Sequence, residues 1–386
     1  MNFLLGYLKL QEETEIPQEF SLWSSISGVS CALGRNVWLD QGAYVLFPNF
    51  YVLLLAGSGY LHKSTAINEV ARMLSKVEPP LNLIRQKITP EALIEYMRVP
   101  RPDPEKKLDA EVNQGFIIAG EFSSFLNRRS YDQGLGVMVT DLYDCDDVFE
   151  YRTKARGIER ISNVWCGILG ASTLDWFKES MPASAIGGGL TSRMILVYVD
   201  RKPDPVAWIE FGPEKRKLRE DLVKELQRLT LIHGAFTLTP DAKKLHEEEY
   251  KSFHGSSELY HSKISQGYAG RRDKHLLKIA MILSCVEGDT LVINESHITG
   301  AYSILKKTEE DLIRVLRLVT ATDKGMASID IAEIIQEHKS ITQSDLLRKV
   351  SHRMDAKEMR DVLATLEMES KIRVNLSGRN TQYEWI

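Results

Sequence analysis

The chain has 386 residues, and at roughly 150 residues per domain this length corresponds to two or three domains. Hydrophobic residues make up 43% and charged residues 26%, a balance that is typical of a globular protein and excludes a disordered chain. With 49 basic and 53 acidic residues, the net charge of −4 excludes binding of nucleic acid through overall charge, so any such contact must be local.

The cysteines and the apolar segments place the chain in a broad class. The four cysteines stand far apart and form no C-x-x-C pair, so we expect no zinc site, and their scarcity favours a reducing cytoplasm. The first ten residues lack the basic stretch of a secretory signal, and we expect an amphipathic helix there. The longest apolar run, residues 51–56, is far shorter than the ~20 residues that span a bilayer, so we expect no membrane contact.

The first 45 residues predict a mainly helical segment. Residues 17–34 show helical periodicity, with Trp23, Ile26 and Val29 on one face, and residues 37–39 read as a short strand. Residues 49–56 form a continuous apolar run, which is typical of a strand buried on both faces of a parallel sheet.

Residues 46–200 predict an α/β domain. A glycine-rich loop follows the first apolar strand, and residues 63–77 then carry helical periodicity. Thr89, followed by Pro90, predicts the start of another helix. Further buried strands are expected at 115–120, 164–171 and 194–199, so strands alternate with helices along this part of the chain.

The rest of the chain predicts a helical lid domain and a winged helix. Residues 201–320 contain charged amphipathic stretches at 214–229, 240–253, 271–286 and 296–320. In residues 321–386, three helices (328–337, 343–350 and 355–370) are followed by two short strands (372–374 and 383–385), with a turn at 340–342. Three helices and a hairpin of these lengths predict a winged helix, an elaborated helix-turn-helix.

The strongest chemical signal follows the first apolar strand. The loop reads Gly57, Ser58, Gly59, Tyr60, Leu61, His62, Lys63, Ser64 and Thr65. It matches the phosphate-loop pattern G-x-x-x-x-G-K-[ST] at Gly57, Lys63 and Ser64, with His62 in place of the second glycine. Backbone N–H groups at a helix start bind anions, Lys63 would reach the outer phosphates of ATP, and Ser64 would hold Mg²⁺. The alternative is a chance lysine and serine at a helix start.

Two later strands end in polar residues that suit the same chemistry. Glu121 follows the strand at 115–120, where it could orient water or bind Mg²⁺, although Gly120 stands where an aspartate is often found. It could instead be a helix-start carboxylate. We expect the strand before Glu121 to neighbour the strand before the glycine loop. Ser172 and Thr173 could sense a γ-phosphate or cap the next helix.

Arg193 follows a glycine run at 187–189 and precedes the fourth strand. An arginine on such a segment suits an arginine finger that enters a neighbour's nucleotide site and stabilises charge on the transferring phosphoryl group. The alternative is an arginine that pairs with a surface acid.

Local charge gives candidate nucleic-acid contacts. Four aspartates at 141–147 lack the spacing of a calcium loop, and we interpret them as a solvated loop. The segment at 151–160 sets Tyr151 beside several cations, as in a loop that contacts single-stranded DNA, and a solvated charged face is equally consistent. Residues 321–386 carry 10 Lys/Arg and 11 Asp/Glu, whereas a duplex reader is normally basic. The winged helix is therefore expected to contact a protein, such as a replication protein, or to touch DNA through its wing at Lys371, Arg373 and Arg379.

Taken in order, eight stretches of the chain resemble a known family. They are PQEFSLWSSISGVSCALGRNVW, FPNFYVLLLAGSGYLHKSTAI, ITPEALIEYM, FIIAGEFSSFL, LYDCDDVFEYRTK, ILGASTLDWF, AIGGGLTSRMILVY and GYAGRRDKHLLKIAMIL. The pattern is similar to that of RecA-like ATPases of phages, prophages and plasmids, whose members often accompany primase domains and are described as helicase-like. The resemblance spans most of residues 17–320.

The resemblance implies a RecA-like core, ATP hydrolysis with Mg²⁺ and ring assembly, with a hexamer as the expected ring. The family's loop commonly reads G-x-x-x-x-x-K-[ST], so His62 fits it. By the same resemblance Lys63, Ser64 and Glu121 would carry ATP and Mg²⁺, and Arg193 would act in trans. It also favours Arg271 or Arg272 as a lid residue over the nucleotide, the alternative being the charged start of an amphipathic helix.

Together these features predict an ATP-dependent motor of a mobile element that moves along single-stranded DNA. A different class stays open: an ATP-binding regulatory or adaptor protein with little hydrolysis, which acts through its winged helix. Gly120 and the acidic third helix of the winged helix favour the second class.

Overall fold

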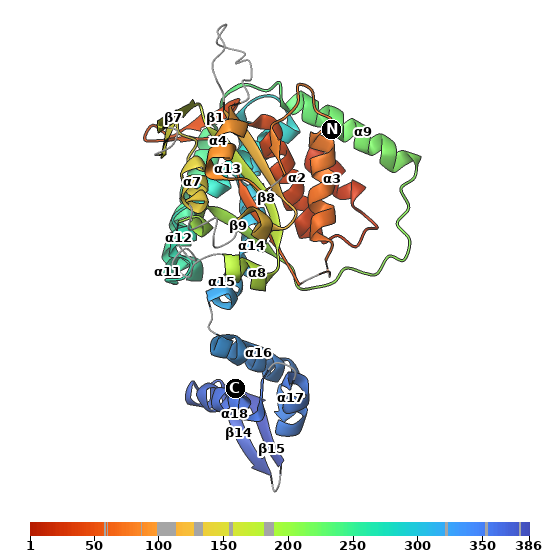
Figure 1. The fold of residues 1–386 in the computed structure, drawn as a ribbon, viewed down its shortest axis with the longest axis vertical. Helices are drawn as coiled ribbons and strands as arrows, with labels where there is room; N and C mark the ends of the chain where they lie inside the picture. Colours follow the sequence, from red (N-terminus) through yellow and green to blue (C-terminus); the bar gives the residue numbers. More distant parts are fainter. Residues whose placement is uncertain are drawn as a thin grey trace. The chain divides into compact units, whose positions relative to one another are not determined.

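The computed structural model describes residues 1–57, 59, 61–85, 87–98, 113–126, 134–153, 157–180, 189–320, 323–351, 354–377 and 380–386. The chain divides into two compact units, residues 1–316 and residues 317–386 (Figure 1). The first unit contains the segments for which we predicted three separate domains, and that finer division stays a prediction.

The first unit is built on a parallel sheet. Its described strands are β4 (Leu83–Ile84), β5 (Gln114–Ala119), β8 (Trp165–Ser172), β3 (Tyr51–Leu55) and β9 (Met194–Tyr198), hydrogen-bonded in that order. Every pairing is parallel, which confirms the expected α/β class with a mostly parallel sheet and is compatible with a RecA-like core. The four long strands match the apolar runs of the sequence, because both faces of each strand are buried.

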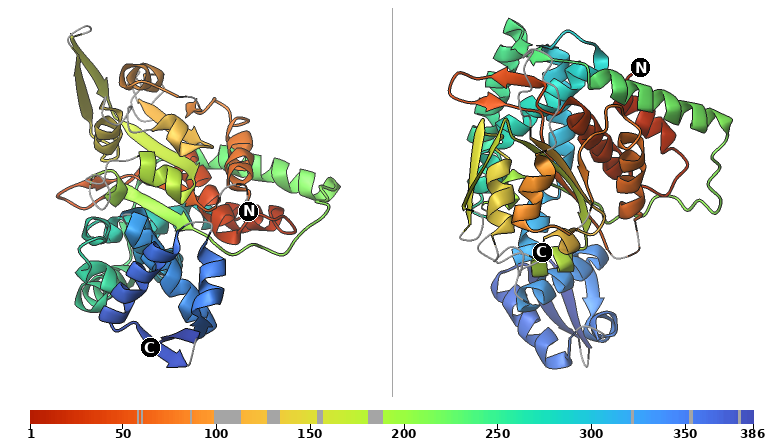
Figure 2. Two further views of the ribbon diagram at one scale, coloured as in Figure 1. Left: turned by 60° about the horizontal axis from the view of Figure 1, so that its bottom comes forward. Right: turned by 45° about the horizontal axis from the view of Figure 1, so that its top comes forward.

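Helix α2 (Gln18–Leu33) is buried on nearly all sides and packs against β3, β8 and β9. Two of its serines donate their hydroxyls to backbone carbonyls, Ser27 to Trp23 and Ser30 to Pro48, whereas the buried hydroxyls of Ser21 and Ser24 have no partner among the described residues. Helix α1 (Phe3–Leu10), which the sequence predicts, packs on α2 and α9 (Pro213–Leu229), as Figure 2 shows.

The remaining helices of this unit are α3 (Lys63–Leu74), α4 (Pro90–Met97), α5 (Phe122–Phe125), α7 (Leu135–Leu142), α8 (Leu174–Ser180), α10 (Pro240–Ser256), α11 (Glu258–His261), α12 (Gln266–Ala269), α13 (Arg272–Glu287), α14 (Glu295–Glu309) and the 3₁₀ turn η2 (Thr191–Arg193), with α15 (Leu312–Thr320) at the boundary. The predicted start of α4 is confirmed, since the Thr89 hydroxyl accepts a bond from the N–H of Ala92.

Several short strands escape the sequence prediction. They include β2 (Val45–Leu46), β10 (Gly234–Ala235), β11 (Thr237–Leu238) and β12 (Val292–Ile293), whereas β1 (Val37–Asp40) was predicted. The segment at 151–153, expected in a loop, lies in β6 (Val148–Thr153), which pairs with β7 (Gly157–Ser162) as an antiparallel hairpin. That expectation was wrong because alternating charged and apolar residues here form a half-exposed strand.

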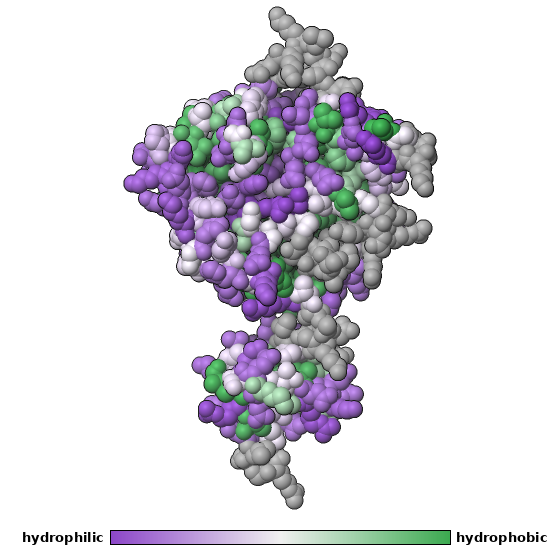
Figure 3. Space-filling view, turned by 90° about the vertical axis from the view of Figure 1, so that its left-hand side faces the viewer, coloured by the Kyte–Doolittle hydropathy of each residue, from purple (hydrophilic) through white to green (hydrophobic). Residues whose placement is uncertain are grey.

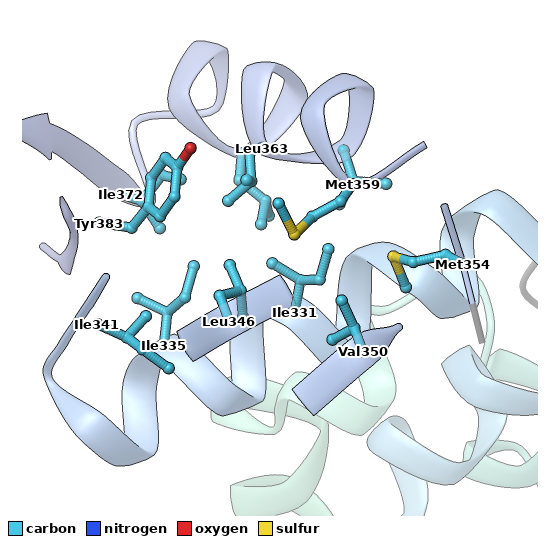
Figure 4. Packing of buried hydrophobic residues seen from close by; sticks show 12 residues of the cluster. Ile331, Ile335, Ile341, Leu346, Val350, Met354, Met359, Leu363, Ile372 and Tyr383 are labelled. Atoms are coloured by element: carbon cyan, nitrogen blue, oxygen red, sulfur yellow. The ribbon is translucent and has the colours of Figure 1, made fainter. Parts of the chain in front are cut away.

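The second unit contains α16 (Asp323–His338), α17 (Gln343–Val350), α18 (Ala356–Met368) and an antiparallel sheet in the order β13 (Ser340–Thr342), β15 (Asn380–Trp385), β14 (Ile372–Ser377). The three predicted helices and two strands are therefore present. The predicted turn at 340–342 is instead β13, which pairs with β15. Figure 4 shows the core, in which Ile331 and Ile335 of α16 face Leu363 of α18 and Tyr383 of β15.

The outward-facing residues in Figure 3 are mainly hydrophilic, with hydrophobic side chains in scattered groups. Among the described helices, none has the length and apolar character needed to cross a bilayer.

Candidate functional site

The glycine loop, residues 57–62, connects the carboxyl end of β3 to the first residue of α3. Gly59 has φ +65° and Leu61 is fully buried, so Leu61 anchors the loop to the core. The predicted site residues Ser58 and Tyr60 lie outside the described residues. The described loop residues therefore stand where the sequence predicts them, between a buried strand and a helix.

His62 takes the left-handed conformation, with φ +48° and ψ +31°. Glycine adopts this conformation without the steric cost that a Cβ adds, which explains why the related pattern has glycine here. The carbonyl of His62 accepts hydrogen bonds from the N–H groups of Thr65 and Ala66, and α3 begins directly after it. The unpaired N–H groups and the positive end of the helix dipole therefore lie at this loop.

Lys63 folds back over the glycine loop. Its Nζ donates to the carbonyl of Ala56 at 2.9 Å and to the carbonyl of Gly57 at 2.8 Å. Burial lowers the pKa of Lys63, and the carboxylate of Glu121 opposes that shift. The ammonium group thus lies within the loop, where it is held by carbonyls and not by a carboxylate at ion-pair distance.

Ser64, in the first turn of α3, and Glu121, just after β5, meet at this loop. The Ser64 hydroxyl donates to the carbonyl of Gly120 at 3.3 Å. Burial raises the pKa of Glu121, whereas the charge of Lys63 and a hydrogen bond from Ser123 lower it. The structure therefore brings Lys63, Ser64 and Glu121 together.

The expectation that the strand before Glu121 neighbours the loop strand was wrong. β8 lies between β3 and β5, and the carboxyl ends of all three strands meet at one edge of the sheet. Parallel pairing explains why Glu121 still reaches the loop, because parallel strands end at the same edge.

The end of β8 supplies two polar residues beside the loop. The hydroxyl of Thr173 accepts a bond from the N–H of Trp176, so Thr173 caps α8, one of the two predicted roles. Ser172 is fully buried and its strand position pairs with Leu55, the last residue of β3. Among the described residues its Oγ has no hydrogen-bond partner, which is unusual for a buried hydroxyl and marks it as a group able to bind a ligand or water.

Glu15 was not identified from the sequence, yet it ties the glycine loop to a distant segment. Its Oε2 lies 3.0 Å from Nε2 of His62, and its Oε1 accepts the N–H of Val206 at 2.9 Å. These bonds, the one from Val206 first, lower the pKa of Glu15. No sequence pattern links these residues, because the contact joins three segments far apart in the chain.

Arg193 lies at the other edge of the sheet. β3 and β9 run parallel from the Tyr51–Met194 pair to the Leu55–Tyr198 pair, so Arg193 precedes β9 while the glycine loop follows β3. Its Nη2 donates to Asp144 at 2.8 Å and its Nη1 donates to the carbonyl of Gly189. Its Nε is buried without a partner. Within one chain Arg193 cannot reach Lys63, and it pairs with an acid as the alternative interpretation expected.

Arg271 does not lie over the glycine loop of its own chain, contrary to the expectation for a lid residue. It lies close enough to Arg193 for the two positive charges to interact, and Asp144 offsets that repulsion. Burial, followed by the charge of Arg193, lowers the pKa of Arg271. The sequence could not reveal this position, because the path of the chain decides at which edge of the sheet α13 begins.

A buried lysine on α13 was also missed. Nζ of Lys278 donates to Oδ1 of Asn49 at 2.7 Å and lies 4.1 Å from the ring centre of Tyr143. Burial lowers the pKa of Lys278 to about 7. A single lysine inside the apolar run LLKIAMIL is the signal that could have identified it.

The other candidate nucleic-acid contacts have structural partners. In the described part of the β6–β7 hairpin, Arg152 and Arg160 both donate to Glu150. Lys154 and Arg156 lie outside the described residues. The cluster at 141–147 is not wholly a solvated loop, since Asp144 pairs with Arg193 and Asp147 pairs with Arg35. Across the described residues, no group of His, Cys, Asp and Glu side chains is arranged to hold a metal ion by itself.

Comparison with known proteins does not assign the chain to a family. No protein-family model matches the chain, and no curated protein sequence matches it.

Proposed function

We propose that the glycine loop is a phosphate loop that binds ATP, and that the protein is an ATPase which acts on nucleic acid. The observation that carries this proposal is the meeting of Lys63, Ser64 and Glu121 at the first turn of α3, after a strand buried on both faces. A cation, a hydroxyl and a carboxylate at a helix N-terminus form the set that phosphoryl transfer needs. The buried hydroxyl of Ser172 adds a fourth polar group at the same edge.

The residues present fit ATP and Mg²⁺ only in part. Lys63 must release the carbonyls of Ala56 and Gly57 to reach a phosphate, a change that only its flexible side chain has to make. The hydroxyl of Ser64 and the carboxylate of Glu121 would hold Mg²⁺, and Gly120 leaves that side without the second carboxylate that the resemblance implies. Bound Mg²⁺ would neutralise charge on the β- and γ-phosphate oxygens.

In the proposed ATP hydrolysis each of these residues would have its own role. The first N–H groups of α3 and the Lys63 ammonium bind the phosphates, and Lys63 stabilises negative charge on the γ-phosphate. Glu121 orients the attacking water and accepts its proton. The raised pKa of Glu121 suits a base, since a carboxylate of higher pKa holds a proton better.

The position of Arg193 is consistent with action in trans, because Arg193 lies at the edge of the sheet away from its own loop. An arginine finger from a second copy would have to exchange Asp144 for a phosphate. The proposal therefore includes a ring, expected to be a hexamer, and movement along single-stranded DNA.

The second unit has the element order of a winged helix, which we propose as its fold class. Its third helix, α18, carries Glu358, Asp361 and Glu367, so a protein surface is a better partner for that helix than DNA. A replication protein is the partner class that the proposal favours.

Turnover of ATP with and without single-stranded DNA tests this function. A motor should hydrolyse ATP faster when DNA is added, and Lys63→Ala should lose at least tenfold of that rate, because the phosphates lose their cation. Lys76→Ala, an exposed lysine just beyond α3, is the matched control and should match the wild type. Equal turnover in Lys63→Ala and the wild type would show that the site is elsewhere.

An ATP-binding adaptor with slow hydrolysis is the second candidate, and Gly120 is the observation that favours it. A Cβ built at Gly120 meets no atom within 4 Å, so the backbone there has room for the Cβ of an aspartate. If the missing carboxylate limits turnover, Gly120→Asp should hydrolyse ATP faster than Gly120→Asn, which has the same shape without the charge. Fast ATP hydrolysis by the wild type that DNA stimulates further would instead rule out the adaptor function.

A further inference from the structure

A cavity of about 280 Å³ opens beside the first turns of α3. His62, Thr65 and Glu69 of the loop and helix form one wall, and residues of the α1–α2 connection and of the segment at 206–211 form the others. The volume is near the lower end of the range, ~300–1,000 Å³, in which proteins bind small molecules. Figure 1 shows the segment that carries residues 206–211 running past this end of α3 before α9 begins.

The walls away from α3 combine apolar side chains with polar ones, the latter being Gln11, Thr14, Glu15 and Arg219. Ile16, Val206, Ile209 and Phe211 all line the cavity. Ile209 is 50% exposed, so half of its apolar side chain is accessible to a ligand in the cavity. These side chains form an apolar surface on which a flat aromatic ligand can pack.

Phe211 is held in place from the helix side. The guanidinium of Arg219 lies 4.0 Å from the centre of the Phe211 ring, and Arg219 donates two bonds to the carboxylate of Glu69, at 2.7 and 3.1 Å. Because Glu69 belongs to α3, the ring is fixed relative to the glycine loop. A ring fixed in this way loses little entropy when a ligand stacks on it.

The cavity and the glycine loop are one continuous site. Glu15, which lines the cavity, contacts His62 at the end of the loop and the backbone of Val206 on the far wall. Ser64 faces Gly120 on one flank of α3, whereas His62 and Thr65 face the cavity on the other. A triphosphate whose metal-binding end lies at Ser64 and Glu121 would leave the loop on the cavity side.

We propose that this cavity binds the planar base of the nucleoside triphosphate, between Ile209 and Phe211. The inference rests on the proposed function, because it places the base of the nucleotide whose phosphates lie at the glycine loop. A larger cavity, of about 390 Å³, lies beyond β9, but charged side chains such as Asp200, Lys307 and Arg314 line it and no loop residue does. An uncharged ring suits the smaller, more apolar cavity.

Binding of two ligands to one variant tests the proposal. The full chain is titrated with ATP and with inorganic tripolyphosphate, which has the phosphates and no base. Ile209→Glu puts a charge where the base would stack, and Leu231→Glu, at a leucine that is 77% exposed elsewhere in the same unit, is the matched control. We expect Ile209→Glu to weaken ATP binding about tenfold or more, as loss of one stacked base does, and to leave tripolyphosphate binding unchanged.

The other outcomes overturn the inference in distinguishable ways. Unchanged ATP affinity in Ile209→Glu would show that the base binds elsewhere, and it would not contradict binding of the phosphates at the glycine loop. Loss of tripolyphosphate binding along with ATP binding would show that Ile209 supports the loop itself. If the wild type binds neither ligand, both the proposed ATPase function and the proposed base site are wrong.

Discussion

At His62 a histidine occupies a backbone conformation that glycine adopts more easily. The sequence identifies the position, since His62 replaces a glycine of the phosphate-loop pattern, but only the backbone explains the replacement. The bond between His62 and Glu15 offsets part of the steric cost. The histidine is therefore compatible with the loop.

Two variants of His62 measure that cost. His62→Gly and His62→Ala both remove the imidazole and its contact with Glu15, and they differ only in the Cβ at φ +48°. We expect His62→Gly to be more stable than His62→Ala by about 1 kcal/mol, the penalty of a Cβ in the left-handed region. Urea unfolding of both variants measures the difference, and an equally or more stable His62→Ala would contradict the backbone assignment.

Lys278 predicts a pH dependence of stability. Its pKa is about 7 in the folded chain and ~10.4 in an unfolded one, so the unfolded state binds more protons between these values. Stability should therefore rise with pH above 7, and the cost of a protonated Lys278 should be fully present below it. The wild type should gain about 2 kcal/mol over Lys278→Met between pH 7 and pH 9, because the slope approaches ~1.4 kcal/mol per unit only once the folded chain has lost the proton.

Urea unfolding of the wild type and Lys278→Met at pH 7 and pH 9 checks this prediction. Lys263→Met, at an exposed lysine, is the control and should show no such change relative to the wild type. A constant difference between the wild type and Lys278→Met across this range would mean that Lys278 keeps an ordinary pKa.

At the level of helices and strands, the sequence predicts those elements whose residues show a clear local pattern of apolar side chains. β3, β5, β8 and β9 were predicted because a strand buried on both faces must be apolar throughout. β4 was missed because two residues carry no periodicity. β10 was missed because it pairs with β1 across almost 200 residues of sequence, which no local pattern records.

The same limit applies to the candidate site. Lys63, Ser64 and Glu121 were predicted because the glycine loop after β3 leads to Lys63 and Ser64, Glu121 follows β5, and parallel strands end at one edge. Arg271 was placed wrongly, and Glu15 was missed, because their positions depend on how distant helices and loops pack. Local sequence therefore predicts the groups attached to the sheet and not those that other segments bring to it.

α13 and α14 are joined by a buried ion pair. Nε of Arg272 donates to the carboxylate of Glu309 at 2.8 Å, and the hydroxyl of Tyr268 donates to the same carboxylate at 2.9 Å. Glu309→Gln would leave Arg272 buried without its counter-charge, and we expect it to lower the free energy of unfolding by about 3 kcal/mol or more. Glu310→Gln, at the exposed neighbour, should change it by less than about 0.5 kcal/mol. Equal stability of the two variants in urea would show that the pair contributes little.

At the scale of the whole molecule, the division at residue 316 separates the candidate site from the second unit. The described residues that make up the candidate site, Lys63, Ser64 and Glu121, all belong to the first unit, and the second unit has a core of its own. We expect a fragment of residues 1–316 to bind ATP with the affinity of the full chain, within about threefold. A fragment of residues 323–386 should show a cooperative thermal transition by circular dichroism. Loss of ATP binding in the first fragment would mean that the second unit completes the site.

The central claim is that the glycine loop holds a triphosphate with the help of Lys63. Isothermal titration of the full chain with Mg²⁺ and a non-hydrolysable ATP analogue tests it most directly, since binding is measured without turnover, DNA or assembly into a ring. We predict one site per chain in the wild type and in Lys76→Met, and at least a tenfold loss of affinity in Lys63→Met. Equal affinity in Lys63→Met, or no binding to the wild type, would contradict the claim.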